Sequence, residues 1–143
     1  MSGLFPRLLR IHQWIYAHTD GLLGHRLLFG NTTLLLRTAG RRTGLLRTTA
    51  LTYARDGEDY LVVASNGGRP KPPTWLGNLE AHPDCEIQVG RRRRRVVGRP
   101  TLPDDPDYSR RWTIVDTNNK GRYAQYQKQT ERPIAVVELR PTS

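Results

Sequence analysis

The sequence predicts a mainly β fold of the α+β class, a closed or split antiparallel barrel with helices across its openings. Two observations lead to this prediction. About six short strand-like runs follow one another along the chain, and most are joined by hairpin signals, which makes neighbouring strands antiparallel. Helix-like segments appear only at the start, in the middle and before the last strand. The 143 residues amount to one domain, over 1–143.

The predicted strands are short apolar or alternating runs separated by turn signals. They cover residues 33–38, 47–53, 60–65, 85–89, 94–99 and 134–139. The Asp56-Gly57 pair predicts a hairpin that leads into 60–65, and Gly90 marks the turn of a second hairpin. The continuous apolar character of residues 60–65 is typical of a central strand that is buried on both faces.

Four segments are predicted to be helical. They cover residues 4–18, 75–81, 107–119 and 123–130. In the first, Leu4, Leu8, Ile11 and Ile15 recur at helical spacing and form an apolar stripe. Two interpretations stay open for this N-terminal amphipathic helix. It packs on the domain, or it lies on a membrane surface with its arginines directed to the headgroups. Thr74 is predicted to cap the second helix.

Charge and cysteine content exclude several classes of protein. Twenty arginines and three lysines give a formal net charge of +10, for which nucleic acid, anionic lipid and a polyanionic small ligand are the candidate partners. Cys85 is the single cysteine, so an intrachain disulfide and a cysteine-based zinc cluster are excluded, and the histidines show no zinc spacing. We expect no metal site. With no spanning stretch and no signal peptide, a cytoplasmic location is expected.

The first candidate binding motif is Thr-Ala-Gly-Arg-Arg-Thr-Gly-Leu-Leu-Arg at residues 38–47. Gly40 and Gly44 allow backbone N–H groups to turn toward a ligand, as in an anion nest. The three arginines of the motif add guanidinium forks that suit phosphate or carboxylate. This pattern favours a clamp for a polyanion, and a solvated basic turn is the alternative.

A glycine-rich loop follows the predicted strand 60–65. Ser65 stands at the strand end, and Gly67 and Gly68 let the backbone approach a flat ligand closely. No Gly-x-Ser-x-Gly elbow and no evident His-Asp pair activate Ser65, so a hydrolase is disfavoured. A long hairpin loop without a ligand is the alternative.

Aromatic residues supply further candidates. In one interpretation Trp75 presents its ring to a ligand, and Asn78, one helix turn later, recognises the ligand by hydrogen bonds. In the other interpretation Trp75 fills the core. Tyr123 and Tyr126 share one helix face. In the functional interpretation they line a pocket and donate a hydrogen bond or a proton. Amphipathic packing is the usual explanation for such a pair. The five consecutive arginines at 91–95 indicate non-specific electrostatic attraction or a solvated hairpin tip.

Taken in this order, the motifs resemble those of the deazaflavin-dependent nitroreductases and quinone reductases of actinobacteria. The resemblance runs from about residue 31 to about residue 139. Its motifs are Thr-x-Gly-Arg-x-Thr-Gly-x-x-Arg at 38–47, a looser Tyr-x-x-Asp-Gly at 53–57, Val-Val-Ala-Ser-x-Gly-Gly at 62–68, Pro-x-Trp-x-x-Asn-Leu at 73–79 and Tyr-x-x-Tyr-Gln-x-x-Thr-x-Arg at 123–132. Five ordered motifs at family-like spacing make the match specific.

The resemblance implies a flavin-binding split β-barrel that holds the reduced 8-hydroxy-5-deazaflavin coenzyme (coenzyme F-420), which carries a phospholactyl group and an oligoglutamate tail. It implies hydride transfer to an activated double bond, a quinone or a nitro compound. The cofactor-binding residues it implies are Arg41, Arg42, Thr43, Arg47, Ala64, Ser65, Asn66, Gly67, Gly68, Trp75 and Asn78. The implied catalytic residues are Ser65, Tyr123 and Tyr126.

Departures from the family pattern limit what is carried over. Arg42 stands where the family often has lysine, and Thr-Trp-Leu at 74–76 stands where some quinone-reducing members have Met-Trp-Tyr. The physiological acceptor therefore stays open. Two alternatives also stay open, an FMN-binding oxidoreductase of the same barrel type and a basic nucleic-acid-associated module without sequence specificity. A monomer is expected, with peripheral membrane contact through the helix at 4–18 as a further possibility at the inner face of the cell membrane.

Overall fold

The computed structural model describes residues 32–143, so the predicted helix at 4–18 lies outside the described residues. The strands are β1 (Thr33–Ala39), β2 (Leu46–Thr52), β3 (Ala54–Asp56), β4 (Asp59–Val63), β5 (Asp84–Val89), β6 (Arg92–Thr101) and β7 (Val136–Pro141). The helices are α3 (Thr74–Ala81), α4 (Tyr108–Asn118) and α5 (Arg122–Gln127), and a short 3-10 turn forms η1 (Asn66–Gly68). The six predicted strands and the three predicted helices of this part are confirmed, with bounds that agree within three residues.

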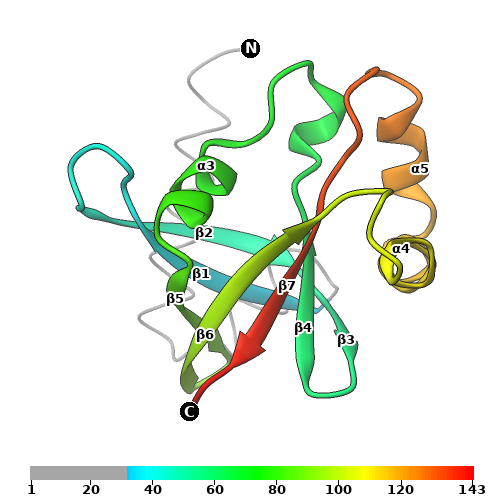
Figure 1. The fold of residues 1–143 in the computed structure, drawn as a ribbon. Coiled ribbons are helices and arrows are strands. Elements are labelled where there is room, and N and C mark those ends of the chain that lie inside the picture. The colour runs from blue at the N-terminus through cyan, green and yellow to red at the C-terminus, as the bar shows by residue number, and fades with distance from the viewer. Residues whose placement is uncertain (1–31) are drawn as a thin grey trace.

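All strands of the described residues belong to one antiparallel sheet in the order β2-β1-β5-β6-β7-β4-β3 (Figure 1). β2 and β3 are neighbours in the chain, separated by Tyr53 alone, yet they lie at opposite edges of this order. The sheet therefore curls until its two edges approach each other, which makes a split barrel. The backbone N–H of Tyr53 donates to the carbonyl of Thr32 (3.1 Å), and its ring lies 5.5 Å from that of Tyr60.

The predicted hairpin at Asp56-Gly57 is confirmed, and the bend adds one strand that was not predicted. The hairpin joins β4 to this short β3, with Ala54 opposite Leu61. β2 pairs with β1. An alternating strand and the three residues after its bend form one continuous run in the sequence. The pattern therefore does not show where the first strand ends or which partner strand each part takes.

The barrel interior is filled from the inner face of the sheet and from α3. Its buried residues are Leu34, Leu36, Tyr60, Val62, Ala64, Trp75, Leu76, Leu79, Cys85, Ile87, Val96, Ala135, Val137 and Leu139. A Cβ on Gly98 would lie 2.5 Å from Cδ1 of Leu79, so the glycine lets α3 approach β6 closely. Figure 1 shows α3, η1 and α5 at the same end of the barrel, away from the C terminus. We call this end the mouth.

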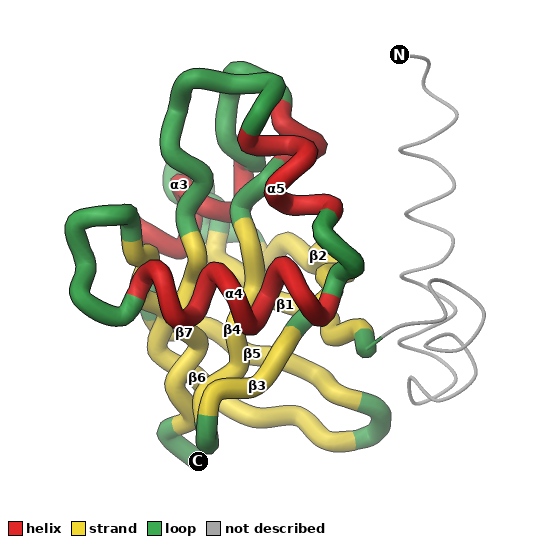
Figure 2. The backbone as a smooth tube through the Cα atoms, turned by 90° about the vertical axis from the view of Figure 1, so that its right-hand side faces the viewer, coloured by secondary structure: helices red, strands yellow, loops and turns green. Residues whose placement is uncertain are grey.

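The outer face of β3, β4 and β7 packs against α4 and α5, and α4 runs across these strands (Figure 2). The buried residues of this second core are Ala54, Leu61, Val63, Tyr108, Val115, Tyr123, Ile134 and Val136. The Tyr108 hydroxyl donates to the carbonyl of Ile134 (2.5 Å). Because β4 contributes to both cores, the prediction that it is buried on both faces is confirmed.

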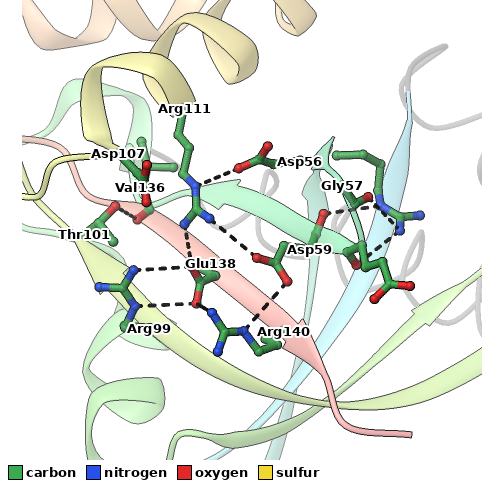
Figure 3. Close-up of polar contacts among 12 residues, drawn as sticks. Asp56, Gly57, Asp59, Arg99, Thr101, Asp107, Arg111, Val136, Glu138 and Arg140 are labelled. Atoms are coloured by element: carbon green, nitrogen blue, oxygen red, sulfur yellow. Dashed lines mark hydrogen bonds and ion pairs between the residues drawn. The ribbon is translucent and has the colours of Figure 1, made fainter.

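A buried ion-pair network joins α4 to the sheet (Figure 3). The Arg111 side chain is 7% exposed, and its Nη1 lies 2.5 Å from Oε2 of Glu138 on β7. Its Nε lies 2.9 Å from Asp56 Oδ2 on β3, and its Nη2 lies 3.5 Å from Asp59 Oδ2 on β4. Burial alone would raise the pKa of Glu138, but the hydrogen bonds from Arg111 and Arg99 outweigh it and hold the pKa below its usual range.

Replacing Arg111 with alanine should lower the free energy of unfolding by about 3 kcal/mol, because the buried Glu138 carboxylate loses its buried partner and keeps only the exposed Arg99 and Arg140. Arg110→Ala is the matched control, since this exposed side chain pairs with the same Asp56 and should cost under about 1 kcal/mol. Urea unfolding of the three proteins measures both values. Equal losses in the two variants would contradict the assigned importance of the buried pair.

Candidate active site

The turn between β1 and β2 is held by its own hydrogen bonds and by α3. The Gly40 N–H donates to the Leu45 carbonyl and the Gly44 N–H donates to the Gly40 carbonyl, both at 2.8 Å. The Arg41 N–H donates to Oδ1 of the buried Asn78 (3.0 Å), which ties the turn to α3. Gly44 has a φ of 73°, in the left-handed region that glycine adopts without strain.

These bonds correct the prediction of an anion nest at Gly40 and Gly44. The N–H groups of both glycines and of Arg41 are bonded within the protein. The two glycine N–H groups are therefore used by the turn itself, while the guanidinium groups and hydroxyls of the turn line the adjoining space.

A cavity of about 250 Å³ opens between this turn and the first turns of α3. Its lining residues are Gly40, Arg41, Arg42, Thr43, Arg47, Thr74 and Asn78. The three arginines are exposed, and no carboxylate is among the lining residues. Because Thr74 is the first residue of α3, the partial positive charge of the helix N-terminus adds to that of the guanidinium groups. A Cβ on Gly77 would lie 2.5 Å from Nη1 of Arg41, so the glycine makes room for this guanidinium against the helix.

The loop after β4 is tightly turned. The Ala64 N–H donates to the Ala135 carbonyl (3.0 Å), and the Gly68 N–H donates to the Ser65 carbonyl (2.9 Å). Asn66, Gly67 and Gly68 all have positive φ, at 45°, 64° and 78°. Ser65 is half-buried, and its hydroxyl makes no capping hydrogen bond to η1. The loop therefore presents a hydroxyl that its own turn does not use.

Gly68 brings this loop against α5. A Cβ at this position would lie 2.6 Å from the Tyr126 carbonyl oxygen and 3.0 Å from its Cα. The loop and the helix backbone are thus in direct contact, at a distance that only glycine permits.

The two tyrosines of α5 differ in environment. Their ring centroids are 6.4 Å apart in an edge-on arrangement. Tyr123 is 7% exposed, and burial, followed by the nearby Tyr126 and Asp116, raises its pKa to about 12. Tyr126 is half-buried at the rim of the outer core. Of the two hydroxyls, that of Tyr126 is therefore the one better placed to meet a ligand.

The structure gives Trp75 and Asn78 supporting positions. Trp75 is 6% exposed and packs in the barrel core, so its ring leaves little surface for a ligand. Asn78 lines the cavity but uses Oδ1 to hold the turn. Their predicted contact with a flat ring stays a prediction.

Apart from Trp75, which packs in the barrel core, the predicted residues fall into three groups at the mouth: the cavity, the loop 64–68 and α5. Sequence reasoning missed Thr74 as a cavity residue. It was predicted as the helix cap, but Pro73 occupies that position and makes no side-chain capping bond. The Pro-Pro pair before Thr74 is the signal that could have moved the helix start by one residue. It also missed Arg132, whose side chain reaches the loop 64–68.

Other features of residues 32–143 lie away from these groups or are lacking. A second, more apolar cavity of about 700 Å³ lies between α4 and α5, and no predicted site residue lines it. Within the described range, no helix is both long and apolar enough to cross a membrane. The same range holds no group of three His, Cys, Asp or Glu side chains suited to a metal ion.

The donor set at the mouth fits the coenzyme that the sequence resemblance implies. Three guanidinium groups, two threonine hydroxyls and a helix N-terminus suit a phosphate and a carboxylate tail. The positive-φ loop 64–68 lets backbone approach a flat ring. A split antiparallel barrel with these two features at its mouth defines a protein of the flavin- and deazaflavin-binding barrel class.

Comparisons with known proteins agree with this class. The chain matches the family model described as F420H(2)-dependent quinone reductase over residues 8–141. F420H(2)-dependent quinone reductases from two strains of Mycobacterium tuberculosis are 53% identical to it over 133 residues, which is 93% of this chain and 89% of theirs. A solved F420-H2 dependent reductase, FDR-A, shares 28% identity and a TM-score of 0.68, over 76% of this chain and 93% of that chain.

The split-barrel fold is also shared more widely. An FAD-binding protein from Mesorhizobium loti has a TM-score of 0.56 at 17% identity, over 85% of this chain and 87% of that chain, which shows the fold alone. The chain therefore belongs to the F420H(2)-dependent quinone reductase family. It is an oxidoreductase whose cofactor is the reduced deazaflavin coenzyme, as the sequence predicted, and FMN becomes the secondary alternative.

Replacing Gly68 with alanine should separate the loop 64–68 from α5, because the new Cβ would meet the Tyr126 backbone at 2.6 Å. We expect a loss of unfolding free energy of about 2 kcal/mol or more, from strain at positive φ and from the contact. Gly67→Ala is the control, since it has a similar φ with nothing within 4 Å and should cost only about 1 kcal/mol. Thermal unfolding compares the two, and equal costs would show that the contact does not matter.

Proposed function

We propose that this protein holds the reduced 8-hydroxy-5-deazaflavin coenzyme across the mouth of its barrel and reduces a quinone or another activated acceptor there. The observation that carries this assignment of residues is the arginine-lined cavity beside the N-terminus of α3. The loop 64–68 and Tyr126 occupy the same end of the barrel. One ligand with a flat ring and an anionic tail would engage all three groups.

The anionic part of the coenzyme would lie in the cavity. Arg41, Arg42 and Arg47 would bind its phosphate and tail carboxylates, with the hydroxyls of Thr43 and Thr74 as further donors. The Arg41 guanidinium already packs against α3 at Gly77, so part of its conformational entropy is lost before a ligand binds.

The ring of the coenzyme would lie along the loop 64–68. The backbone of Gly67, which is exposed, would permit close approach, and Asn66 is fixed by its bond from Nδ2 to the Lys71 carbonyl (2.9 Å). Ala64 forms the floor of this region, since it is fully buried in the barrel core. The loop would thus orient the ring without a protein acid or base acting on it.

The acceptor would bind between the loop and α5. The bound coenzyme supplies the hydride, which carries two electrons, and the quinone also takes up one proton to become a hydroquinone. Ser65 would donate a hydrogen bond to the acceptor oxygen on which negative charge develops. Tyr126 would donate the proton or relay it from solvent. Tyr123 is buried, so we assign it to packing against the outer core.

Oligomeric state and location are separate parts of the proposal. We expect a monomer that acts in the cytoplasm, and residues 4–18 either pack on the domain or contact the inner face of the membrane. One solved relative, 26% identical with a TM-score of 0.69 over 88% of this chain and 96% of that chain, is described as a domain-swapped dimer. Light scattering distinguishes the two states, and liposome co-sedimentation with and without residues 4–18 decides the membrane contact.

Replacing Arg42 and Arg47 together with alanine should raise the Kd of the reduced coenzyme at least about tenfold at low ionic strength. The gap between variant and wild type should narrow as salt rises, because exposed charges are screened. Fluorescence titration in a salt series measures both effects.

The matched control removes the same charge from the β5–β6 hairpin, as Arg92→Ala with Arg93→Ala. It should leave the Kd unchanged within about twofold, since both residues are exposed on a strand that the proposed site does not use. A deazaflavin without phosphate and tail should bind all three proteins equally. Equal weakening by the two double variants would contradict the clamp.

Replacing Ser65 with alanine, or Tyr126 with phenylalanine, should lower kcat about tenfold or more, because each removes a donor aimed at the acceptor. The Kd of the coenzyme should stay nearly constant, since the cavity is untouched. Steady-state kinetics with a water-soluble quinone measure kcat. Tyr123→Phe is the control that should leave kcat unchanged, and a loss there equal to that of Tyr126→Phe would overturn the division of roles.

A further inference from the structure

Arg132 lies in the connection between α5 and β7 and reaches back to the loop after β4. Its Nη2 donates to the Ser65 carbonyl (2.8 Å), its Nη1 to the Ala64 carbonyl (3.3 Å) and its Nε to the Arg69 carbonyl (3.0 Å). One half-buried guanidinium therefore binds both ends of the loop that carries Ser65.

The partners of this guanidinium are all neutral. Among residues 32–143 no carboxylate pairs with Arg132, in contrast to Arg111, which meets three. Carbonyl groups compensate the charge only in part, so burial lowers the pKa of Arg132. A charge-assisted fork held on three carbonyls is stronger and more directional than neutral hydrogen bonds would be.

The position of Arg132 is itself set by α5. Gln127, the last residue of that helix, donates from Nε2 to the carbonyls of Thr130 (3.3 Å) and Arg132 (2.9 Å). Its Oε1 accepts from the N–H of Ile134 (3.0 Å), at the approach to β7. The backbone of the connection is thus held around the Gln127 carboxamide, which fixes the position of the Arg132 backbone from which the side chain extends.

A second contact joins the same two parts of the site. Gly68 touches the backbone of Tyr126, as described above. Arg132 holds both ends of the loop 64–68 to the connection that follows α5, and Gly68 places the loop directly against the α5 backbone.

We propose that Arg132 is a positioning residue for hydride transfer, which sets the separation between the Ser65 loop and Tyr126 without touching coenzyme or acceptor itself. This inference rests on the proposed function, in which the loop borders the coenzyme ring and α5 borders the acceptor. Hydride transfer requires donor and acceptor carbons in close, aligned contact, so a displacement of about 1 Å costs up to about a hundredfold in rate. Binding of the coenzyme through its anionic tail does not have this requirement.

The test compares Arg132→Gln and Arg132→Lys with Arg122→Gln, an exposed arginine at the start of α5. Hydrogen–deuterium exchange without coenzyme should show faster exchange at the amides of Gly68 and Arg69 in Arg132→Gln, with the strand amides unchanged. With coenzyme and quinone, kcat should fall about tenfold to a hundredfold while the Kd of the coenzyme changes less than about threefold. Arg132→Lys should recover part of kcat, and Arg122→Gln should resemble wild type.

Three outcomes would overturn the proposal. Unchanged hydrogen–deuterium exchange at the loop amides would show that Arg132 does not stabilise the loop. Unchanged kcat would show that the hydrogen bonds of Arg132 to the loop do not affect the reaction. Faster exchange throughout the sheet, with a matching loss of thermal stability in both Arg132 variants, would make the role purely structural. If the wild-type protein binds no coenzyme, the proposed function fails, and the assignment of Arg132 to hydride transfer fails with it. Faster loop exchange in Arg132→Gln would in that case still show that Arg132 stabilises the loop, which distinguishes the two failures.

Discussion

A buried guanidinium determines where the helical layer lies on the sheet. Arg111 meets carboxylates from three different strands, and a buried charge that missed them would be costly, so the placement of α4 is narrowly constrained. α5 follows from α4, because Asp116 Oδ1 accepts the N–H of Ala124 (3.1 Å). Tyr126 is in turn placed against Gly68. The geometry of the mouth thus depends on charge pairing on the outer side of the barrel.

Close approach at three glycines completes this arrangement. Gly98 admits Leu79 of α3 to the sheet, Gly77 admits the Arg41 guanidinium to α3, and Gly68 admits the loop to α5. In each case a Cβ at the glycine would come within 2.6 Å of an atom of that neighbour. Gly98 and Gly77 each make room for a side chain, and Gly68 brings two backbone segments into direct contact.

Much of the fold and the family could be predicted from the sequence, whereas the contacts that connect the parts of the site could not. Strand 60–65 and the motif at 38–47 are local patterns, so their position and chemistry are readable from spacing. The division of this stretch into β2 and a separate β3 depends on a bend at Tyr53, and the Arg111 network joins residues far apart in sequence, so neither leaves a local signal. The same holds for the Gly40 and Gly44 N–H groups, whose internal acceptors become visible only once the turn is folded.

The position of the last strand has a consequence for how the chain reaches this state. In chain order β7 comes after every other described element, yet it lies between β6 and β4 inside the sheet. Until residues 136–141 are available, β4 with β3 has no partner that connects it to β6, and the sheet exists as two separate pieces. Barrel closure therefore requires long-range pairing, the slow kind of contact in folding kinetics. The loop after β4 takes its place at the mouth only once β7 has paired with both β4 and β6.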